Sequence, residues 1–129
     1  MQKIIYKGIL LGIKVDKIAS GSRPLTDPKE FIQIVTLKHP QGTYLTAHYH
    51  RPKIRRSAKL QECMIVTKGK VKLDLYTLEG KPVKRVFLNA SQAFIFLNCG
   101  VGVTFIDQSE IIEVKNGPFK VDKILIAND

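Results

Sequence analysis

The clearest pattern in the chain is a strict alternation of apolar and polar side chains over residues 70–77. Val71, Leu73, Leu75 and Thr77 alternate there with lysine, aspartate and tyrosine. Successive side chains of a β-strand point to opposite faces, so this period of two predicts a strand with one buried and one solvated face. A tight Lys68-Gly69 turn joins it to the apolar run before it.

Similar apolar runs recur along the chain at a spacing of about 8–12 residues, separated by turns rich in Gly, Pro, Asn and Asp. Residues 119–126 are a candidate for a final edge strand, and loops are predicted over 18–30 and 51–59. The predicted strands cover 3–16 (one or two strands, with a bend at Gly8 or Gly12), 31–38, 43–50, 62–67, 70–77, 83–88, 93–98, 103–107 and 109–116. No helical period is visible, so we expect an all-β sandwich or barrel.

Size and composition fit one globular domain over residues 1–129. No apolar run reaches the length of a membrane span, and Lys7 interrupts the apolar N-terminal run, which we assign to the folded protein rather than to a signal peptide. The two cysteines, Cys63 and Cys99, indicate a reduced, cytoplasmic protein rather than a disulfide scaffold.

The chain is strongly basic, with 21 Lys and Arg against 11 Asp and Glu and a formal net charge of +10. This excess favours anionic partners such as phosphates, carboxylates or nucleotides, and a surface of solvated charges is the alternative. Nucleic acid is not the expected partner, because the basic residues are spread over many segments without interleaved aromatic side chains that stack on bases. A small anionic ligand is the expectation that remains.

Three residues are candidates for a metal site. His48 and His50 are two positions apart, so a strand over 43–50 would point both imidazoles to the same face. Glu62 begins the next apolar strand, and the three side chains converge if the two strands are neighbours. Two imidazoles and a carboxylate bind a divalent metal and leave positions open for water or substrate. The alternative is a polar patch satisfied by water and by hydroxyls such as that of Thr46.

The same alternation predicts the surroundings of Glu62. Glu62 shares a strand face with Met64 and Val66, so this face is expected to point inward. Cys63 and Ile65 then lie on the opposite face, and Cys63 is not expected to bind the metal.

Other side chains are expected to lie near the metal. Val103, Phe105 and Asp107 share a strand face and would form a largely apolar wall opposite it. Tyr44 shares the face of His48 and would place its hydroxyl over the substrate.

The stretch from Gly42 to Gly69 resembles the first sequence motif of the cupin superfamily. That motif is a glycine, five residues, His-x-His, a short interval, a glutamate, six residues and a glycine, and it is matched by Gly42, His48, His50, Glu62 and Gly69. The interval from His50 to Glu62 holds eleven residues, where the family has three or four. The resemblance implies a cupin-type β-barrel, also called a double-stranded β-helix or jelly roll, with a divalent metal. Such barrels often pair through edge strands, so we also expect a homodimer.

A second cupin motif would supply a fourth ligand, a histidine that follows a turn. In this chain Asn98-Cys99-Gly100 takes the place of the turn, and Val103 stands where the histidine is expected. The expected ligands are therefore His48, His50 and Glu62. Such a set does not distinguish Zn²⁺, Fe²⁺, Mn²⁺ and Ni²⁺.

A basic loop connects the second histidine to the glutamate, so it must lie near any site that these residues form. Its cations are Arg51, Lys53, Arg55, Arg56 and Lys59. They would concentrate an anion and hold it by charge-assisted contacts, and a solvated run of charges is the alternative. We expect Arg51, Lys53, Arg55 and Arg56 to bind the substrate, together with Tyr44.

These expectations describe a metal-binding cupin that binds or acts on a small anionic molecule. Residues 113–119 also resemble the E-x-K-x-G-P-(Tyr/Phe) ending of small cupins associated with surface-polysaccharide biosynthesis, which makes a sugar or sugar nucleotide the favoured ligand. Two alternatives stay open. One is a metal-free sugar-nucleotide isomerase or epimerase in which a histidine is the general base. The other is a non-catalytic cupin that binds a ligand or regulates a partner.

Overall fold

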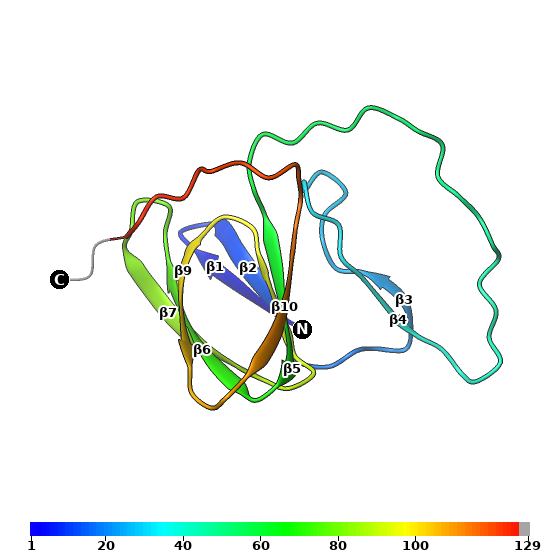
Figure 1. The fold of residues 1–129 in the computed structure, drawn as a ribbon, viewed down its shortest axis with the longest axis horizontal. Coiled ribbons are helices and arrows are strands. Elements are labelled where there is room, and N and C mark those ends of the chain that lie inside the picture. The colour runs from blue at the N-terminus through cyan, green and yellow to red at the C-terminus, as the bar shows by residue number, and fades with distance from the viewer. Residues whose placement is uncertain (127–129) are drawn as a thin grey trace.

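A computed structural model describes residues 1–126, and over this range the chain is all-β, as the alternation predicts (Figure 1). The strands are β1 (Gln2–Tyr6), β2 (Ile9–Val15), β3 (Gly21–Pro24), β4 (Val35–Lys38), β5 (Glu62–Lys68), β6 (Lys70–Tyr76), β7 (Pro82–Asn89), β8 (Ala93–Phe96), β9 (Gly100–Phe105) and β10 (Glu110–Lys115). Turns join most of them in sequence, which explains why local patterns locate them well.

The strands form three antiparallel sheets. One has five strands in the order β1-β2-β8-β5-β10, one has three in the order β7-β6-β9, and β3 pairs with β4 in a separate hairpin. Within residues 1–126 no sheet closes into a barrel, so the predicted closure is not observed. Strands β9 and β10 each lie at the end of a sheet, with one edge unpaired in the described part of the chain.

The main core is built from residues of both larger sheets, which therefore pack face to face. Met64 and Val66 of β5 are buried against Val71, Leu73 and Leu75 of β6, with further contributions from β7 and β8. The predicted inward face of β5 is thus confirmed. Alternation along β6 gives the buried and half-buried positions expected from its sequence.

A second core covers the other face of the five-stranded sheet. Ile13, Cys63 and Ile95 are buried there against Ile32, which lies in the connection between β3 and β4. Residue Ile65 packs on the same cluster, so Cys63 and Ile65 do lie opposite to Glu62 and Met64 in the way that strand parity predicts. The central strands β5 and β8 are consequently buried on both sides.

Several predicted elements are wrong, and non-local pairing explains each error. Residues 43–50 and 119–126 form no strand, and only Val35–Lys38 of the predicted strand 31–38 is paired. Conversely, Gly21–Pro24 lies in a predicted loop but pairs with β4. Its Gly and Pro argue against a strand locally, yet β3 belongs to a two-stranded hairpin and is an edge strand, where a missing N–H is tolerated.

The whole connection between β4 and β5 is extended and leaves the sandwich on the side of β3 and β4 (Figure 1). We call residues 39–60 the arm; every one of them is exposed. Large apolar side chains are included, since Tyr49 is 90% and Ile54 is 87% exposed. A connection of this length without secondary structure is uncommon in a compact domain and is usually either a functional loop or a linker.

The Gly69 turn between β5 and β6 yields a stability prediction. Gly69 has a φ of +85°, and a Cβ there would collide with the Ser109 hydroxyl and the Gln108 carbonyl. We expect Gly69→Ala to lower the free energy of unfolding by about 2–4 kcal/mol, through left-handed strain plus the clash. Chemical denaturation measures this.

Gly80→Ala is the matched control. Gly80 has a φ of +88°, but its nearest contact would be the Ile126 side chain at 3.7 Å. Only backbone strain is added, about 1–2 kcal/mol. Equal losses for the two variants would show that contact with the 108–109 turn does not constrain Gly69.

Candidate functional site

The two histidines of the arm lie against each other. The ring centroids of His48 and His50 are 5.3 Å apart, with an interplanar angle of 78°. Nδ1 of His48 is 2.8 Å from the carbonyl oxygen of Thr46. Because a carbonyl only accepts, Nδ1 carries a proton in this contact, and Nε2 is the ring nitrogen left for a metal or another partner.

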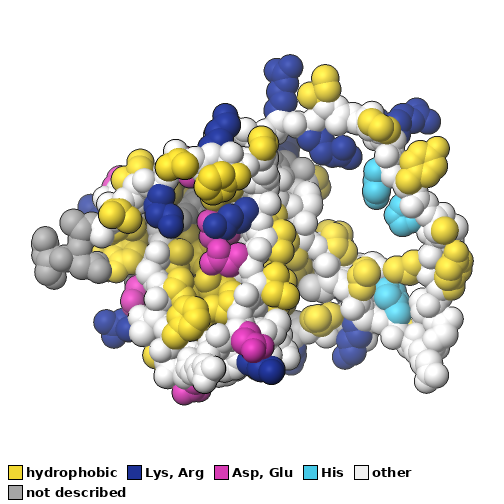
Figure 2. Space-filling view, viewed as in Figure 1, with side chains coloured by type: hydrophobic (Ala, Val, Ile, Leu, Met, Phe, Trp, Pro, Cys, Tyr) yellow, Lys and Arg dark blue, Asp and Glu magenta, His cyan; other side chains and the backbone are white. Residues whose placement is uncertain are grey.

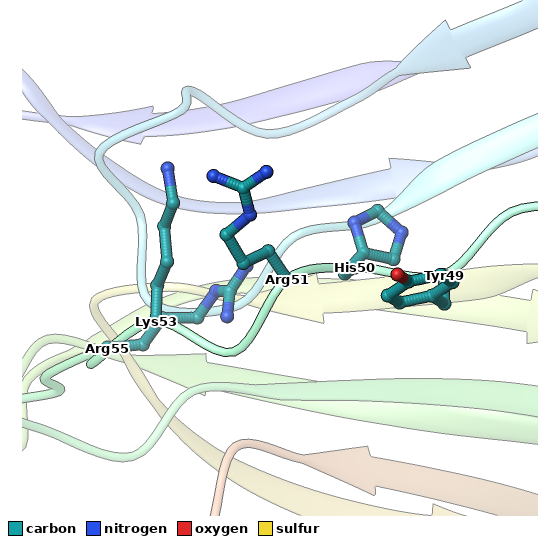
Figure 3. Close-up of a pocket in the computed structure, with 5 residues that line it drawn as sticks. All are labelled: Tyr49, His50, Arg51, Lys53 and Arg55. Carbon is teal, nitrogen blue, oxygen red and sulfur yellow. The ribbon is translucent and has the colours of Figure 1, made fainter.

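Beside His50 the arm forms a hollow that contains three cations. We call it the cationic hollow; it is lined by Tyr49, His50, Arg51, Lys53 and Arg55 (Figure 3). Arg51 and Lys53 project to the same side of the arm. No acid lines the hollow, so an anion entering it meets uncompensated guanidinium and ammonium groups, which make strong charge-assisted hydrogen bonds.

The other predicted ligand-binding residues, Tyr44 and Arg56, lie on the arm but do not line this hollow. Tyr44 is not on a strand, and its hydroxyl accepts a hydrogen bond from the backbone N–H of Ala47 at 3.3 Å. The expected shared face of Tyr44 and His48 is therefore absent in this conformation. A space-filling view shows histidine, lysine and arginine side chains of the arm standing clear of the sandwich (Figure 2).

A second group of charges lies on the inward face of the five-stranded sheet. Glu62 is opposite Lys115 in the β5–β10 register, and Glu113 is opposite Met64, so the three charged side chains share one face. The Nζ atom of Lys115 is 3.7 Å from a carboxylate oxygen of Glu62 and 3.4 Å from one of Glu113. The charge of Glu62 and a hydrogen bond to Glu113 raise the pKa of Lys115.

Two features of this group escaped the sequence analysis. The E-x-K spacing of Glu113 and Lys115 was noted only as part of a resemblance, although residues two apart on a strand share a face. Their position beside Glu62 depends on the register of β10, which no local pattern reveals.

Cys99 lies near the charged group, but its thiol is unreactive at neutral pH. It packs against the main core, and burial, with a smaller contribution from the charge of Glu62, raises its pKa to about 12. Burial alone raises the pKa of Cys63 to about 11. Both thiols stay protonated at neutral pH, so neither is a nucleophile or a thiolate ligand there.

Polar side chains tie the base of the arm to the sandwich. The Asn116 side chain accepts a hydrogen bond from the Gln61 backbone N–H at 2.6 Å and donates to Ser57 Oγ and the Lys59 carbonyl, each at 3.0 Å. Lys59 also donates to the side chain of Asn98. The arm is thus anchored next to Glu62, while its histidines lie farther out.

The buried Gln61 side chain extends this anchor into the second core. Its Oε1 accepts from the backbone N–H of Ile32 at 2.9 Å, and its Nε2 donates to Glu30 at 2.6 Å. Sequence reasoning missed both residues, because Gln61 belongs to no motif and Asn116 occupies a variable position of the E-x-K-x-G-P-(Tyr/Phe) ending.

The residue types of the predicted metal site fit a divalent cation, but their arrangement does not. No group of three or more His, Cys, Asp or Glu residues in the described part of the chain could hold a metal ion. His48 and His50 are together on the arm, whereas Glu62 lies on β5 beside Lys115. Val103, on the inward face of β9, is opposite Leu73.

Comparison of the chain with protein-family models, with curated proteins and with solved structures found no match. Among residues 1–126 there is no helix with the length and hydropathy needed to cross a membrane.

The effect of the Glu62 charge on the pKa of Cys99 gives a prediction on pH dependence. In a Cys63→Ala background, alkylation of Cys99 by iodoacetamide should rise with pH well beyond the range of an ordinary thiol, because the pKa of Cys99 is about 12. Glu62→Gln removes a nearby negative charge and should lower the pKa of Cys99, raising its alkylation rate severalfold at any fixed pH below it. Mass spectrometry measures the rate.

Glu110→Gln is the control, because Glu110 lies at the far end of the same strand pair, beside Lys68. It should leave the rate unchanged. An equal change in both variants would place Glu62 away from Cys99.

Proposed function

We propose that the chain is a cupin-like jelly roll that binds a small anionic molecule, and that His48, His50 and Glu62 hold a divalent metal once the arm has closed onto β9. The observation that carries this proposal is that His50 belongs both to the cationic hollow and to the pair of adjacent imidazoles. One short segment thus combines metal-ligand side chains with an anion-binding surface.

The free edge of β9 supports the closure of the arm. Val103 and Phe105 are paired with Leu73 and Val71, which are fully buried, yet they are themselves 38% and 56% exposed. A further strand along β9 would cover these apolar side chains and satisfy the backbone groups of the edge. The alternating, β-branched and aromatic residues 43–50 suit this position.

Closure would also bring the ligand types together. The arm ends two residues before Glu62, whose side chain lies on the inward face and is only 25% exposed. If His48 and His50 occupy the inward face of the added strand, Tyr49 lies on the outer face. Two imidazoles and a carboxylate between the sheets would leave coordination positions open, and Zn²⁺, Fe²⁺, Mn²⁺ and Ni²⁺ all suit such a set.

The proposed ligand is a sugar or sugar nucleotide, and the cationic hollow favours the sugar nucleotide because it carries phosphate. Arg51, Lys53 and Arg55 supply the charge in the hollow, and Arg56 follows them on the arm. Guanidinium groups match phosphate geometry in a bidentate manner, and the exposed Tyr49 ring offers an apolar surface to a base or sugar.

A metal-free sugar-nucleotide isomerase or epimerase is the second candidate. The tautomer of His48 favours it, because the bond from Nδ1 to Thr46 leaves Nε2 free to accept a proton close to the hollow. In this case the histidine acts as general base, and no metal is required.

The metal proposal predicts a defined stoichiometry. Protein purified without chelator, or reloaded with Mn²⁺ or Zn²⁺, should carry about one metal ion per chain by elemental analysis. His50→Ala and Glu62→Gln should each lose it. His39→Ala is the control and should keep it, because His39 contacts Ser22 at the far end of the arm.

The same samples test the closure. Hydrogen exchange of residues 43–50 should slow when the metal binds, since pairing with β9 protects backbone amides. A metal content near zero that added Mn²⁺ and Zn²⁺ do not restore would exclude the metal proposal and leave the isomerase or a plain binding module.

The anion proposal predicts binding of phosphate compounds by the arm. UDP-glucose should raise the melting temperature by mass action, whereas glucose should not. The double variant Arg51→Ala/Arg55→Ala should weaken UDP-glucose binding about tenfold or more, because each charge-assisted hydrogen bond contributes about 1.5–3 kcal/mol. The control Lys81→Ala/Lys84→Ala removes two exposed cations of the β6–β7 region and should have little effect. Equal losses in both double variants would indicate non-specific attraction to the basic surface.

A further inference from the structure

Strand β10 leaves one edge of the five-stranded sheet open. Its other edge pairs with β5, and within residues 1–126 no strand covers the open one. The N–H of Asn116 donates to the carbonyl of Gln61 at 3.4 Å, so the backbone groups of every second residue from Asn116 back to Ile112 face β5. Glu113 and Lys115 therefore present their N–H and C=O groups to the open edge, where they can pair with another strand.

The outer side of this edge is apolar. Ile112 and Val114 point away from the main core and are 54% and 44% exposed. They lie beside Ile65 and Cys63 of β5, which belong to the second core, and so continue that apolar surface to the edge of the sheet. Apolar side chains next to an unpaired edge form a surface that a partner strand would cover.

The charge of β10 selects the partner. A second copy of the chain carries the same net charge of +10, so most of the two surfaces repel each other. Strand β10 differs from the rest of the chain, because it contains Glu110, Glu113 and a single cation, Lys115. An edge that holds both signs of charge can pair with its own copy in a register that brings opposite charges together.

Only one register of two antiparallel copies does this. A twofold axis at Glu113 would place the two Glu113 carboxylates against each other, and an axis at Ile112 would place Glu113 opposite Ile111. With the axis at Val114, Glu113 of each copy is opposite Lys115 of the other, and the backbones of these residues exchange the edge hydrogen bonds. We propose that the chain forms a homodimer in which β10 pairs with β10 of a second copy about Val114.

This pairing joins the two five-stranded sheets into one continuous sheet. On its outer face the two Val114 side chains are directly opposed in a non-hydrogen-bonded pair, with Cα atoms about 4.5 Å apart. Ile112 of each copy lies opposite Asn116 of the other, so the exposed apolar side chains of both strands become covered. The expected homodimer thereby has a defined contact surface, which requires neither the metal nor the closure of the arm.

The inner face gains ion pairs. Within one chain, Nζ of Lys115 is already 3.7 Å from Glu62 and 3.4 Å from Glu113. In the dimer Lys115 also meets Glu113 of the second copy, so the two Glu113 and two Lys115 side chains alternate in sign around the axis. A contact along one short strand is at the small end of protein interfaces, and we therefore expect a dimer that dissociates on dilution.

A cysteine at the axis tests the register. Val114→Cys is made in a Cys63→Ala background, because Cys63 faces Val114 across the β5–β10 pair. Its thiol should form an intermolecular disulfide under mild oxidation, since the separation of the two Cα atoms suits a disulfide. Non-reducing electrophoresis and mass spectrometry measure the yield of the covalent dimer.

Two further cysteine variants in the same background are controls, with folding verified by circular dichroism. Ile112→Cys lies on the same face of β10 but opposite Asn116, so alone it should stay reduced, whereas a mixture with Asn116→Cys chains should crosslink. Thr104→Cys is exposed on β9, the end strand of the other large sheet, and it reports random collisions. It should stay reduced as well.

Charge variants test the ion pairs. Lys115→Glu turns two attractive cross-strand pairs into repulsive ones and should weaken dimerisation about tenfold in sedimentation equilibrium. The exchange Glu113→Lys/Lys115→Glu restores opposite charges between the copies and should recover most of the affinity. Lys68→Glu is the matched control, because Lys68 pairs with Glu110 at the other end of β5 and β10. It should not weaken dimerisation.

A concentration-dependent dimer that crosslinks through Val114→Cys and is weakened by Lys115→Glu supports the proposal. A chain that sediments as a monomer at every concentration overturns it. So does a dimer in which Thr104→Cys crosslinks as readily as Val114→Cys, or in which Lys68→Glu has the effect of Lys115→Glu, because the contact then lies elsewhere. None of these results depends on metal content or on UDP-glucose binding, so a failure here leaves the proposed function standing.

Discussion

The burial of strand β5 on both of its faces is the constraint on which the rest of the structure depends. Met64 and Val66 pack into the core between the sheets, and Cys63 packs into the second core under the β3–β4 connection. A strand held from two sides cannot rotate or shift its register without moving every side chain to the wrong environment. Glu62, the first residue of this strand, is thereby fixed on the inward face. This also fixes where its carboxylate lies relative to the charged side chains around it.

The strands at the edges of the sheets are less constrained than β5, because one side of each is unpaired. A strand at an edge presents backbone donors and acceptors that need a partner, and proteins normally cover or block such edges. Here β9 ends one sheet with apolar inward side chains still exposed, while the arm, which carries a strand pattern over 43–50, lies away from it. The same segment thus holds an unused strand pattern and two of the three expected metal ligands. The unpaired edge of β9 and the unpaired strand pattern of the arm together are the main support for the proposed closure.

How much the sequence could predict depends on whether the deciding interaction is local. The alternation over 70–77 predicts a strand correctly because a hairpin neighbour always supplies its partner. The inward and outward faces around Glu62 also follow from parity alone. In contrast, residues 43–50 also carry a strand pattern but pair with no other strand, because a local pattern does not determine whether a segment docks on an edge.

In the candidate site, too, some features follow from local sequence and others depend on contacts between distant segments. The residue types of the metal site and the basic character of the arm are visible in the sequence, whereas the contact of Lys115 with Glu62 requires the register of β10 against β5. Gln61 and Asn116 were unpredictable for a similar reason, because their hydrogen bonds join segments that are distant along the chain.

The distribution of charge explains why the two halves of the site would assemble only with a ligand present. The arm contains no Asp or Glu, and its cations lie close together between residues 51 and 59. Folding it against the sandwich concentrates these charges and costs electrostatic free energy, which a bound anion removes. The carboxylates of Glu62 and Glu113 attract the same cations from the other side, although Lys115 already pairs with both. In the proposed closure, anion binding, metal binding and strand pairing would be linked events, and each would strengthen the others by a coupling free energy of about 1–3 kcal/mol.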